Sequence, residues 1–135
     1  NGTYIGIEPN KDTYNELVIL SSSFKNVFLI NSTVEEYLKN NILRGDIDLA
    51  FTSIPYYDRE TYSNTVHYNN FNEWKDLFLD SILSLPNLVL NIPQNLKEDI
   101  ISQSKKCIVD EYIFRSNADH FHKNRFKDEF LLKFY

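Results

Sequence analysis

The sequence predicts an α/β fold with a mostly parallel sheet that ends in an antiparallel hairpin. Short apolar segments alternate with amphipathic ones along most of the chain, and the connections between them are short, which is typical of a parallel sheet. The last two apolar segments, 107–114 and 129–135, follow each other with no amphipathic segment between them. We therefore expect helices on both faces of the sheet and a hairpin at one edge.

Three strands are expected in the first half of the chain, at 3–7, 27–30 and 47–52. The sequence of 27–30, VFLI, is wholly apolar, as in a strand that is buried on both faces. Between the strands, 12–20 carries apolar residues on one helical face. Thr33 and Glu36 have the spacing of a capping box, which predicts a helix through 41.

The second half is expected to contain a polar loop at 53–70, helices at 72–83 and 93–103, and strands at 87–92, 107–114 and 129–135. In the first of these helices, Trp74, Leu77, Phe78 and Ile82 are expected to face the core. Pro93 suits the first turn of the next helix.

The bulk properties narrow the class of protein. A length of 135 residues suits a single domain, 1–135, and no apolar run approaches the roughly 18 residues that a membrane helix needs. No secretory signal is visible, and the one cysteine, Cys107, fits a reducing compartment, which predicts a cytoplasmic protein, or a nuclear one in a eukaryote. The net charge of −5 argues against tight, charge-driven binding of nucleic acid by this chain alone. The absence of Met and an opening that runs straight into a strand suggest a segment of a longer protein.

Polar residues follow the first two predicted strands, where an open parallel sheet binds its ligands. Glu8 ends the first strand, and its two carboxylate oxygens suit the hydroxyl groups of a ribose. Asn31, Ser32 and Thr33 end the second strand and offer groups to the edge of an adenine ring. Taken alone, Glu8 and Thr33 are better explained as caps of the helices that follow them.

The third strand ends in a turn with a more specific chemistry, Ser53-Ile54-Pro55-Tyr56. An aromatic residue after a proline offers a flat surface on which a planar base stacks. A serine oxygen and a backbone carbonyl nearby provide two acceptors for the two N–H groups of an exocyclic amino group. Such contacts draw the nitrogen lone pair out of ring conjugation and orient it toward a methyl group, provided that the base has left its stack.

At this point the sequence resembles the S-adenosylmethionine-dependent amino-methyltransferases of DNA. DLAFTSIPYYD is similar to their catalytic motif, in which Asp, Asn or Ser precedes Pro-Pro and an aromatic residue. YIGIEPN looks like the acidic motif that holds the cofactor ribose, and VFLINSTVEEY looks like the motif that reaches its adenine. The continuation YDRETYS is similar to a subgroup found in bacteria, phages and large viruses.

The resemblance implies a Rossmann-like methyltransferase fold and a role for each residue. Glu8 would hold the ribose, and Asn31, Ser32 or Thr33 would contact the adenine of S-adenosylmethionine. Ser53 and the carbonyl of Ile54 would accept the target amino group, with Pro55 shaping the turn, and Tyr56 would stack on the base. A serine at the head of the turn leans toward N4 of cytosine over N6 of adenine, and related turns also serve RNA bases and glutamine side chains.

Two features depart from the family pattern. Ile54 replaces the usual first proline, so the fixed φ angle is lost. The family's first strand and its Gly-rich turn have no counterpart, since no Gly-x-Gly turn follows a strand. In that fold the strand lies between the acidic and catalytic strands, so we expect a gap in the sheet that a missing segment or another chain fills.

Other candidate sites are weaker. His120 and His122 with Cys107 lack the spacing of a metal centre, and we expect no metal. The basic stretch 120–127 could bind a phosphate backbone or could be a solvated loop. His67 and Tyr68 could line the substrate cleft or could lie on a surface loop.

The sequence thus predicts methyl transfer to adenine or cytosine in DNA. The alternative is a catalytically inactive methyltransferase-like domain that acts as a structural or binding partner.

Overall fold

The computed structural model describes residues 2–40, 47–54, 68–104, 108–116 and 127–135, with the backbone alone at 108–109, 114–116 and 127–128. The chain divides into two compact units, and each has its own sheet. The first unit contains residues 1–42 and 56–81, and the second contains residues 43–55 and 82–135. A single domain over 1–135 therefore stays a prediction.

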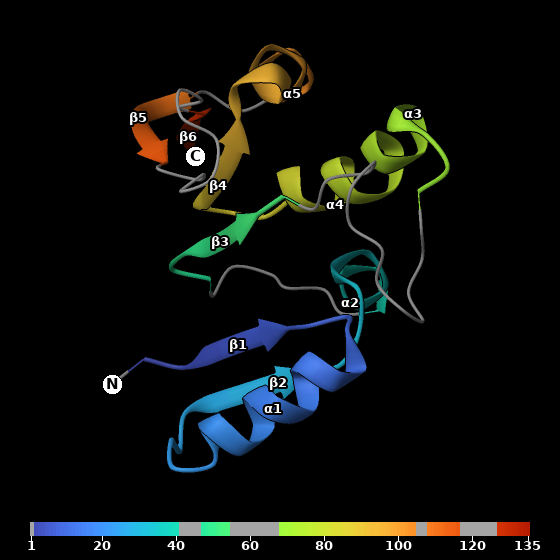
Figure 1. Ribbon diagram of the computed structural model, residues 1–135, viewed down its shortest axis with the longest axis vertical. Coiled ribbons are helices and arrows are strands. Elements are labelled where there is room, and N and C mark those ends of the chain that lie inside the picture. The colour runs from blue at the N-terminus through green and yellow to red at the C-terminus, as the bar shows by residue number, and fades with distance from the viewer. Residues whose placement is uncertain (1, 41–46, 55–67, 105–107, 117–126) are drawn as a thin grey trace, which may run out of the picture. The chain divides into compact units, whose positions relative to one another are not determined.

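The first unit has a parallel pair of strands, β1 (Tyr4–Ile7) and β2 (Val27–Ile30), joined through helix α1 (Lys11–Ser21). Figure 1 shows the two strands running in the same direction with α1 alongside. Asn10 caps α1, because its side chain accepts hydrogen bonds from the N–H groups of Asp12 and Thr13. Because Gly6 has no side chain, the Leu29 side chain has room beside β1. A Cβ atom at position 6 would lie only 2.8 Å from Leu29 Cδ2.

Helix α2 (Val34–Asn40) follows β2, as the capping-box spacing predicts. Thr33 Oγ1 accepts a hydrogen bond from the Glu36 N–H at 3.2 Å, which is one half of the box. The Glu36 carboxylate bonds instead to Ser32 Oγ at 3.2 Å. The helix therefore begins where the sequence predicts, with the acidic partner shifted by one residue.

A helical stretch runs through α3 (Phe71–Trp74), a π-helical turn η1 (Lys75–Leu79) and α4 (Asp80–Leu83). Trp74, Phe78 and Ile82 are buried, as predicted. Leu77 is 44% exposed and Leu79 is fully buried, so the prediction that Leu77 faces the core is wrong. The physical reason is the π turn, which inserts one extra residue and rotates the next position onto the buried face.

The second unit has a four-stranded mixed sheet in the order β3-β4-β6-β5 (Figure 1). Its strands are β3 (Ala50–Ser53), β4 (Leu88–Pro93), β5 (Ile108–Ser116) and β6 (Lys127–Phe134). β3 and β4 are parallel, whereas β6 pairs antiparallel with both β4 and β5. The predicted C-terminal antiparallel pair is therefore confirmed, while the single sheet predicted for the chain is replaced by two.

One face of the mixed sheet forms the core of the second unit. Its buried residues are Leu88, Leu90 and Ile92 on β4 and Phe130, Leu132 and Phe134 on β6. The 3₁₀ turn η2 (Gln94–Leu96) and helix α5 (Lys97–Gln103) lie over this face, and Lys97 Nζ sits 4.4 Å from the Phe130 ring centroid.

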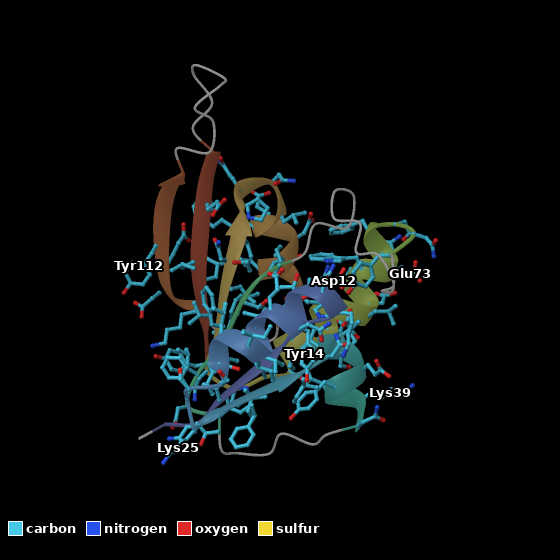
Figure 2. All side chains as sticks on the ribbon, turned by 60° about the horizontal axis from the view of Figure 1, so that its bottom comes forward. Asp12, Tyr14, Lys25, Lys39, Glu73 and Tyr112 are labelled. Carbon is cyan, nitrogen blue, oxygen red and sulfur yellow. The ribbon has the colours of Figure 1, made fainter. Side chains whose placement is uncertain are left out.

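On the opposite face of the mixed sheet, the two edge strands carry exposed side chains, whereas those of the central strands are partly buried. Phe51 on β3 is 61% exposed, and Tyr112 on β5, which Figure 2 shows pointing outward, is 59% exposed. The expectation of helices on both faces is therefore not met in the part of the chain that the structure describes.

The start of β3 and the start of the helix after β4 differ from the prediction, and in both cases the pairing with a neighbouring strand explains the difference. β3 begins at Ala50 rather than at 47, because β4 begins only at Leu88, the register partner of Ala50. Asn87 precedes β4 with a φ of 49° and donates from Nδ2 to the Ile47 carbonyl at 3.1 Å. Pro93 pairs with Glu129 as the last residue of β4, so the helix predicted from 93 begins later.

Candidate functional site

In the first unit, the ends of β1 and β2 lie side by side and bring Glu8 and Asn31 together. Glu8 extends the pairing of the strands, because its N–H donates to the Ile30 carbonyl at 3.0 Å. Asn31 Nδ2 donates to the carbonyls of Glu8 and Pro9 at 2.9 and 3.2 Å. The amide of Asn31 thus ties the two strand ends together, which is a structural role that the sequence did not reveal.

Glu8 is half-buried and uses one carboxylate oxygen within the chain. Its Oε1 accepts a hydrogen bond from the Asn10 N–H at 2.7 Å, just before α1 begins. This contact supports the helix start, as the capping interpretation of Glu8 predicts. Because an ionised carboxylate has about four lone-pair sites, Oε2 and part of Oε1 keep acceptor capacity for a ligand.

A hollow of about 370 Å³ opens beside Glu8, lined by residues of α1 and of both strands. Its lining is mostly apolar and includes Tyr4, Leu17, Phe24 and Leu29. Glu8 is the one charged residue among those that line it. The hollow therefore combines an apolar wall with a single carboxylate acceptor at its side.

Ser32 and Thr33 follow Asn31 and form hydrogen bonds within the same turn. Ser32 Oγ lies 3.0 Å from the Thr33 carbonyl and 3.2 Å from Glu36 Oε2. Thr33 Oγ1 serves the N-terminus of α2, as the capping interpretation predicts. A ligand at this turn would compete with these internal bonds.

In the second unit, Ser53 and Ile54 stand at the carboxyl end of β3. The Ser53 residue is exposed and is the register partner of Asn91 on β4. The Ile54 N–H donates to the Asn91 carbonyl at 3.3 Å, and the Ile54 side chain is only 4% exposed. The ladder thus continues for one residue beyond β3 and holds the Ser53 hydroxyl at an exposed strand end. Pro55 and Tyr56, the other predicted catalytic residues, lie outside the described residues.

Two residues to which the sequence analysis gave no role are linked to Ser53: Asn91 adjoins it, and Glu129 adjoins Asn91. Asn91 Nδ2 lies 3.4 Å from Ser53 Oγ and 3.2 Å from Glu129 Oε2. The sequence predicts that a strand ends near Asn91. The contact of Asn91 with Ser53, however, depends on how β4 pairs with β3. Glu129 belongs to an antiparallel strand, whose register no sequence pattern here specifies.

Among the other candidates, Tyr68 donates its phenolic hydrogen to the Glu35 carboxylate, so this tyrosine is tied to α2. Cys107, His67, His120 and His122 lie outside the described residues, as does almost all of the basic stretch 120–127. In the described part of the chain, no three metal-ligating side chains come together.

No described helix is both long enough and apolar enough to span a bilayer. The sequence matches none of the protein-family models compared with it, and no curated protein matches it either.

Proposed function

We propose that this chain transfers a methyl group from S-adenosylmethionine to an exocyclic amino group of adenine or cytosine in DNA. The observation that carries the proposal is the strand end at Ser53 and Ile54. An exposed serine ends a parallel strand there, its neighbour is anchored by a ladder bond and by burial, and Pro55-Tyr56 follows in the sequence. The carboxyl end of a parallel strand is where such folds bind their ligands.

The residues at the ends of β1 and β2 fit the cofactor in part. S-adenosylmethionine, when bound, supplies the methyl group on a sulfonium centre. Glu8 fits the ribose, because it is among the residues that line the hollow and its carboxylate has acceptor capacity left after its bond to Asn10. Asn31 fits less well as an adenine contact, since its Nδ2 serves two backbone carbonyls, although its Oδ1 remains an acceptor.

At the target base, the chain's own groups bind and orient the amino nitrogen. Ser53 Oγ and the Ile54 carbonyl accept its two N–H groups, and Tyr56 stacks on the ring. These contacts would hold the nitrogen lone pair toward the methyl group that S-adenosylmethionine supplies. That group would pass from sulfur to nitrogen, so that the S–C bond breaks as the N–C bond forms, the sulfur leaves as a neutral thioether, and the nitrogen gives up one proton to solvent. The rate gain comes from orientation and from acceptors that are in place before the reaction.

Ile54 supports this role despite departing from the family's proline. A proline at this position would fix φ but would have no N–H. Ile54 instead uses its N–H in the bond to the Asn91 carbonyl and buries its side chain. A proline and this bonded, buried isoleucine both restrain the backbone at position 54, by different means, so Ile54 is compatible with a preorganised acceptor pair.

Under the proposed function, a further strand pairs at an exposed sheet edge of this chain. It comes from elsewhere in the same protein or from another chain. β1 and β3 are edge strands of their sheets among the described residues. The N–H groups of Tyr4 and Glu8 point toward β2, so those of Ile5 and Ile7 point away from it and can pair with a new neighbour. In the resembling family, the Gly-rich strand is the neighbour of the acidic and the catalytic strand.

The alternative proposal is an inactive methyltransferase-like domain that serves as a structural or binding partner. It is favoured by the internal bonds of the first unit, where Glu8, Asn31 and Thr33 each serve a helix start or a strand end. Under this alternative the polar residues at the strand ends are there for folding alone.

Methyl-transfer assays separate the two proposals. The chain is incubated with radiolabelled S-adenosylmethionine and single- or double-stranded DNA, and labelled bases are identified after hydrolysis. Ser53→Ala and Tyr56→Ala are each expected to lower kcat by about 100-fold or more. Ser102→Ala, an exposed serine on α5, is the matched control and is expected to leave kcat unchanged. Absence of label with every substrate, or full activity of both site variants, would contradict the proposed reaction.

A further inference from the structure

Three neighbouring strand ends of the second unit carry a hydrogen-bonded polar cluster formed by Ser53, Asn91 and Glu129. Ser53 on β3 and Asn91 on β4 are register partners, and Glu129 lies diagonally across on β6. Asn91 Nδ2 is 3.2 Å from Glu129 Oε2 and 3.4 Å from Ser53 Oγ. All three side chains lie on the face of the sheet opposite the buried apolar core, where Ser53 is exposed and Asn91 and Glu129 are partly buried.

Glu129 fixes which way the Asn91 amide points. The oxygen and nitrogen of an asparagine amide are normally assigned from their hydrogen-bond partners. An ionised carboxylate accepts hydrogen bonds and cannot donate them, so the atom that faces Glu129 has to be the Asn91 nitrogen. The same nitrogen then faces Ser53 Oγ, which accepts its second hydrogen.

This bond restrains the serine. A serine side chain at an exposed strand end has three staggered rotamers available to it. Contact with the Asn91 amide favours the rotamer in which Ser53 Oγ faces β4, and it leaves the second lone pair of that oxygen for another donor.

The other end of the Asn91 amide argues against a purely stabilising role. Asn91 Oδ1 is buried and has no hydrogen-bond partner. A buried acceptor without a donor destabilises a fold, which offsets part of what the bond from Nδ2 to Glu129 contributes. The amide therefore adds less net stability than its bonds suggest, while its nitrogen still orients Ser53.

We propose that Asn91 is a positioning residue, held by Glu129, that sets the rotamer of Ser53 for its contact with the target amino group. The consequence for methyl transfer rests on the proposed function, whereas the effect on the Ser53 rotamer does not. Asn91 itself does not contact the base.

The test compares Asn91→Leu with Val89→Leu, a control on the same strand and the same face of the sheet. Three-bond NMR couplings of labelled serine report the Ser53 χ1 distribution, and thermal unfolding reports stability. We expect one dominant Ser53 rotamer in the wild type and in the Val89 variant, and an average over rotamers in Asn91→Leu. The melting temperature of Asn91→Leu is expected to fall, because Glu129 loses the donor that Asn91 Nδ2 provides, so the rotamer distribution is the readout that separates positioning from a merely structural role.

Kinetics provide the second readout. Asn91→Leu is expected to lower kcat by about ten- to a hundredfold while cofactor affinity stays the same. An unchanged Ser53 rotamer in Asn91→Leu, or an unchanged kcat in an active protein, would overturn the role of Asn91. If the wild type transfers no methyl group, the proposed reaction fails, and the rotamer comparison still decides whether Asn91 positions Ser53.

Discussion

At the scale of single residues, Asn87 shows how one side chain sets the start of a strand. Its φ of 49° lies in the left-handed region, and its Nδ2 donates to the Ile47 carbonyl. Asparagine tolerates this conformation better than other residues with a Cβ, because its short polar side chain bonds locally. The turn before β4 therefore depends on both the backbone and the amide of Asn87.

Replacing Asn87 separates these two contributions. Asn87→Ala loses the hydrogen bond and strains the backbone, and we expect a loss of about 2 kcal/mol in the free energy of unfolding. Asn87→Gly loses the bond but adopts the left-handed conformation freely, so we expect a loss of about 1 kcal/mol or less. Urea unfolding measures both, and equal losses in the two variants would contradict strain at this position.

The sequence located polar residues at strand ends but not their partners. Glu8 and Asn31 stand directly after a strand, Ser53 is the last residue of one, and Thr33 follows β2 after two intervening residues. Their places were predictable because the apolar runs before them are clear. The bonds from Glu8 to Asn10 and from Asn31 to the Glu8 carbonyl depend on turn geometry and strand pairing. The same limit explains why Asn91 and Glu129 were missed.

At the scale of elements, the helical stretch from α3 to α4 shows where periodicity fails. Hydrophobic spacing with a period of 3.6 residues places Leu77 next to Phe78 on the inner face. At the π turn η1, Leu79 is buried and Leu77 is exposed, and a regular spacing of 3.6 residues does not predict this. Trp74 keeps its predicted place and stacks near Phe71 and Phe78, with ring centroids 5.5 and 5.8 Å away.

Alanine substitutions test this exchange directly. Leu79→Ala removes a fully buried side chain and is expected to cost about 2–5 kcal/mol in the free energy of unfolding. Leu77→Ala removes a side chain that is 44% exposed and is expected to cost less than about 1 kcal/mol. Urea unfolding of both variants provides the comparison. A larger loss for Leu77→Ala would mean that the helix follows the regular period after all.

Strand existence was easier to predict than strand limits. β2 matches its predicted range in full, because VFLI is bounded by polar residues on both sides. β3 is shorter than its apolar run, since the run extends past the point where β4 offers partners. A strand ends where its neighbour ends, and that information lies elsewhere in the chain.

At the scale of the whole molecule, the described residues form two sheets where one was predicted. The antiparallel pair β5–β6 is the predicted C-terminal pair, and the pairs β1–β2 and β3–β4 are parallel, in agreement with the mostly parallel pairing predicted. The insertion of β6 between β4 and β5 was not predicted, because alternation indicates which segments are strands and not the order in which they pair. The sequence also led us to expect a missing strand between the acidic strand and the catalytic strand. That expectation is part of the proposed function.

The most direct measurement is a calorimetric titration of the chain with S-adenosylmethionine or with its demethylated product. The proposed function predicts binding with a dissociation constant in the micromolar range. Glu8→Ala is expected to weaken it by about ten- to a hundredfold, as the loss of charge-assisted hydrogen bonds does. Glu16→Ala, an exposed acid on α1, removes the same charge and is expected to leave the affinity unchanged. Absence of binding, or equal affinity of the wild type and Glu8→Ala, would contradict a methyltransferase site on this chain.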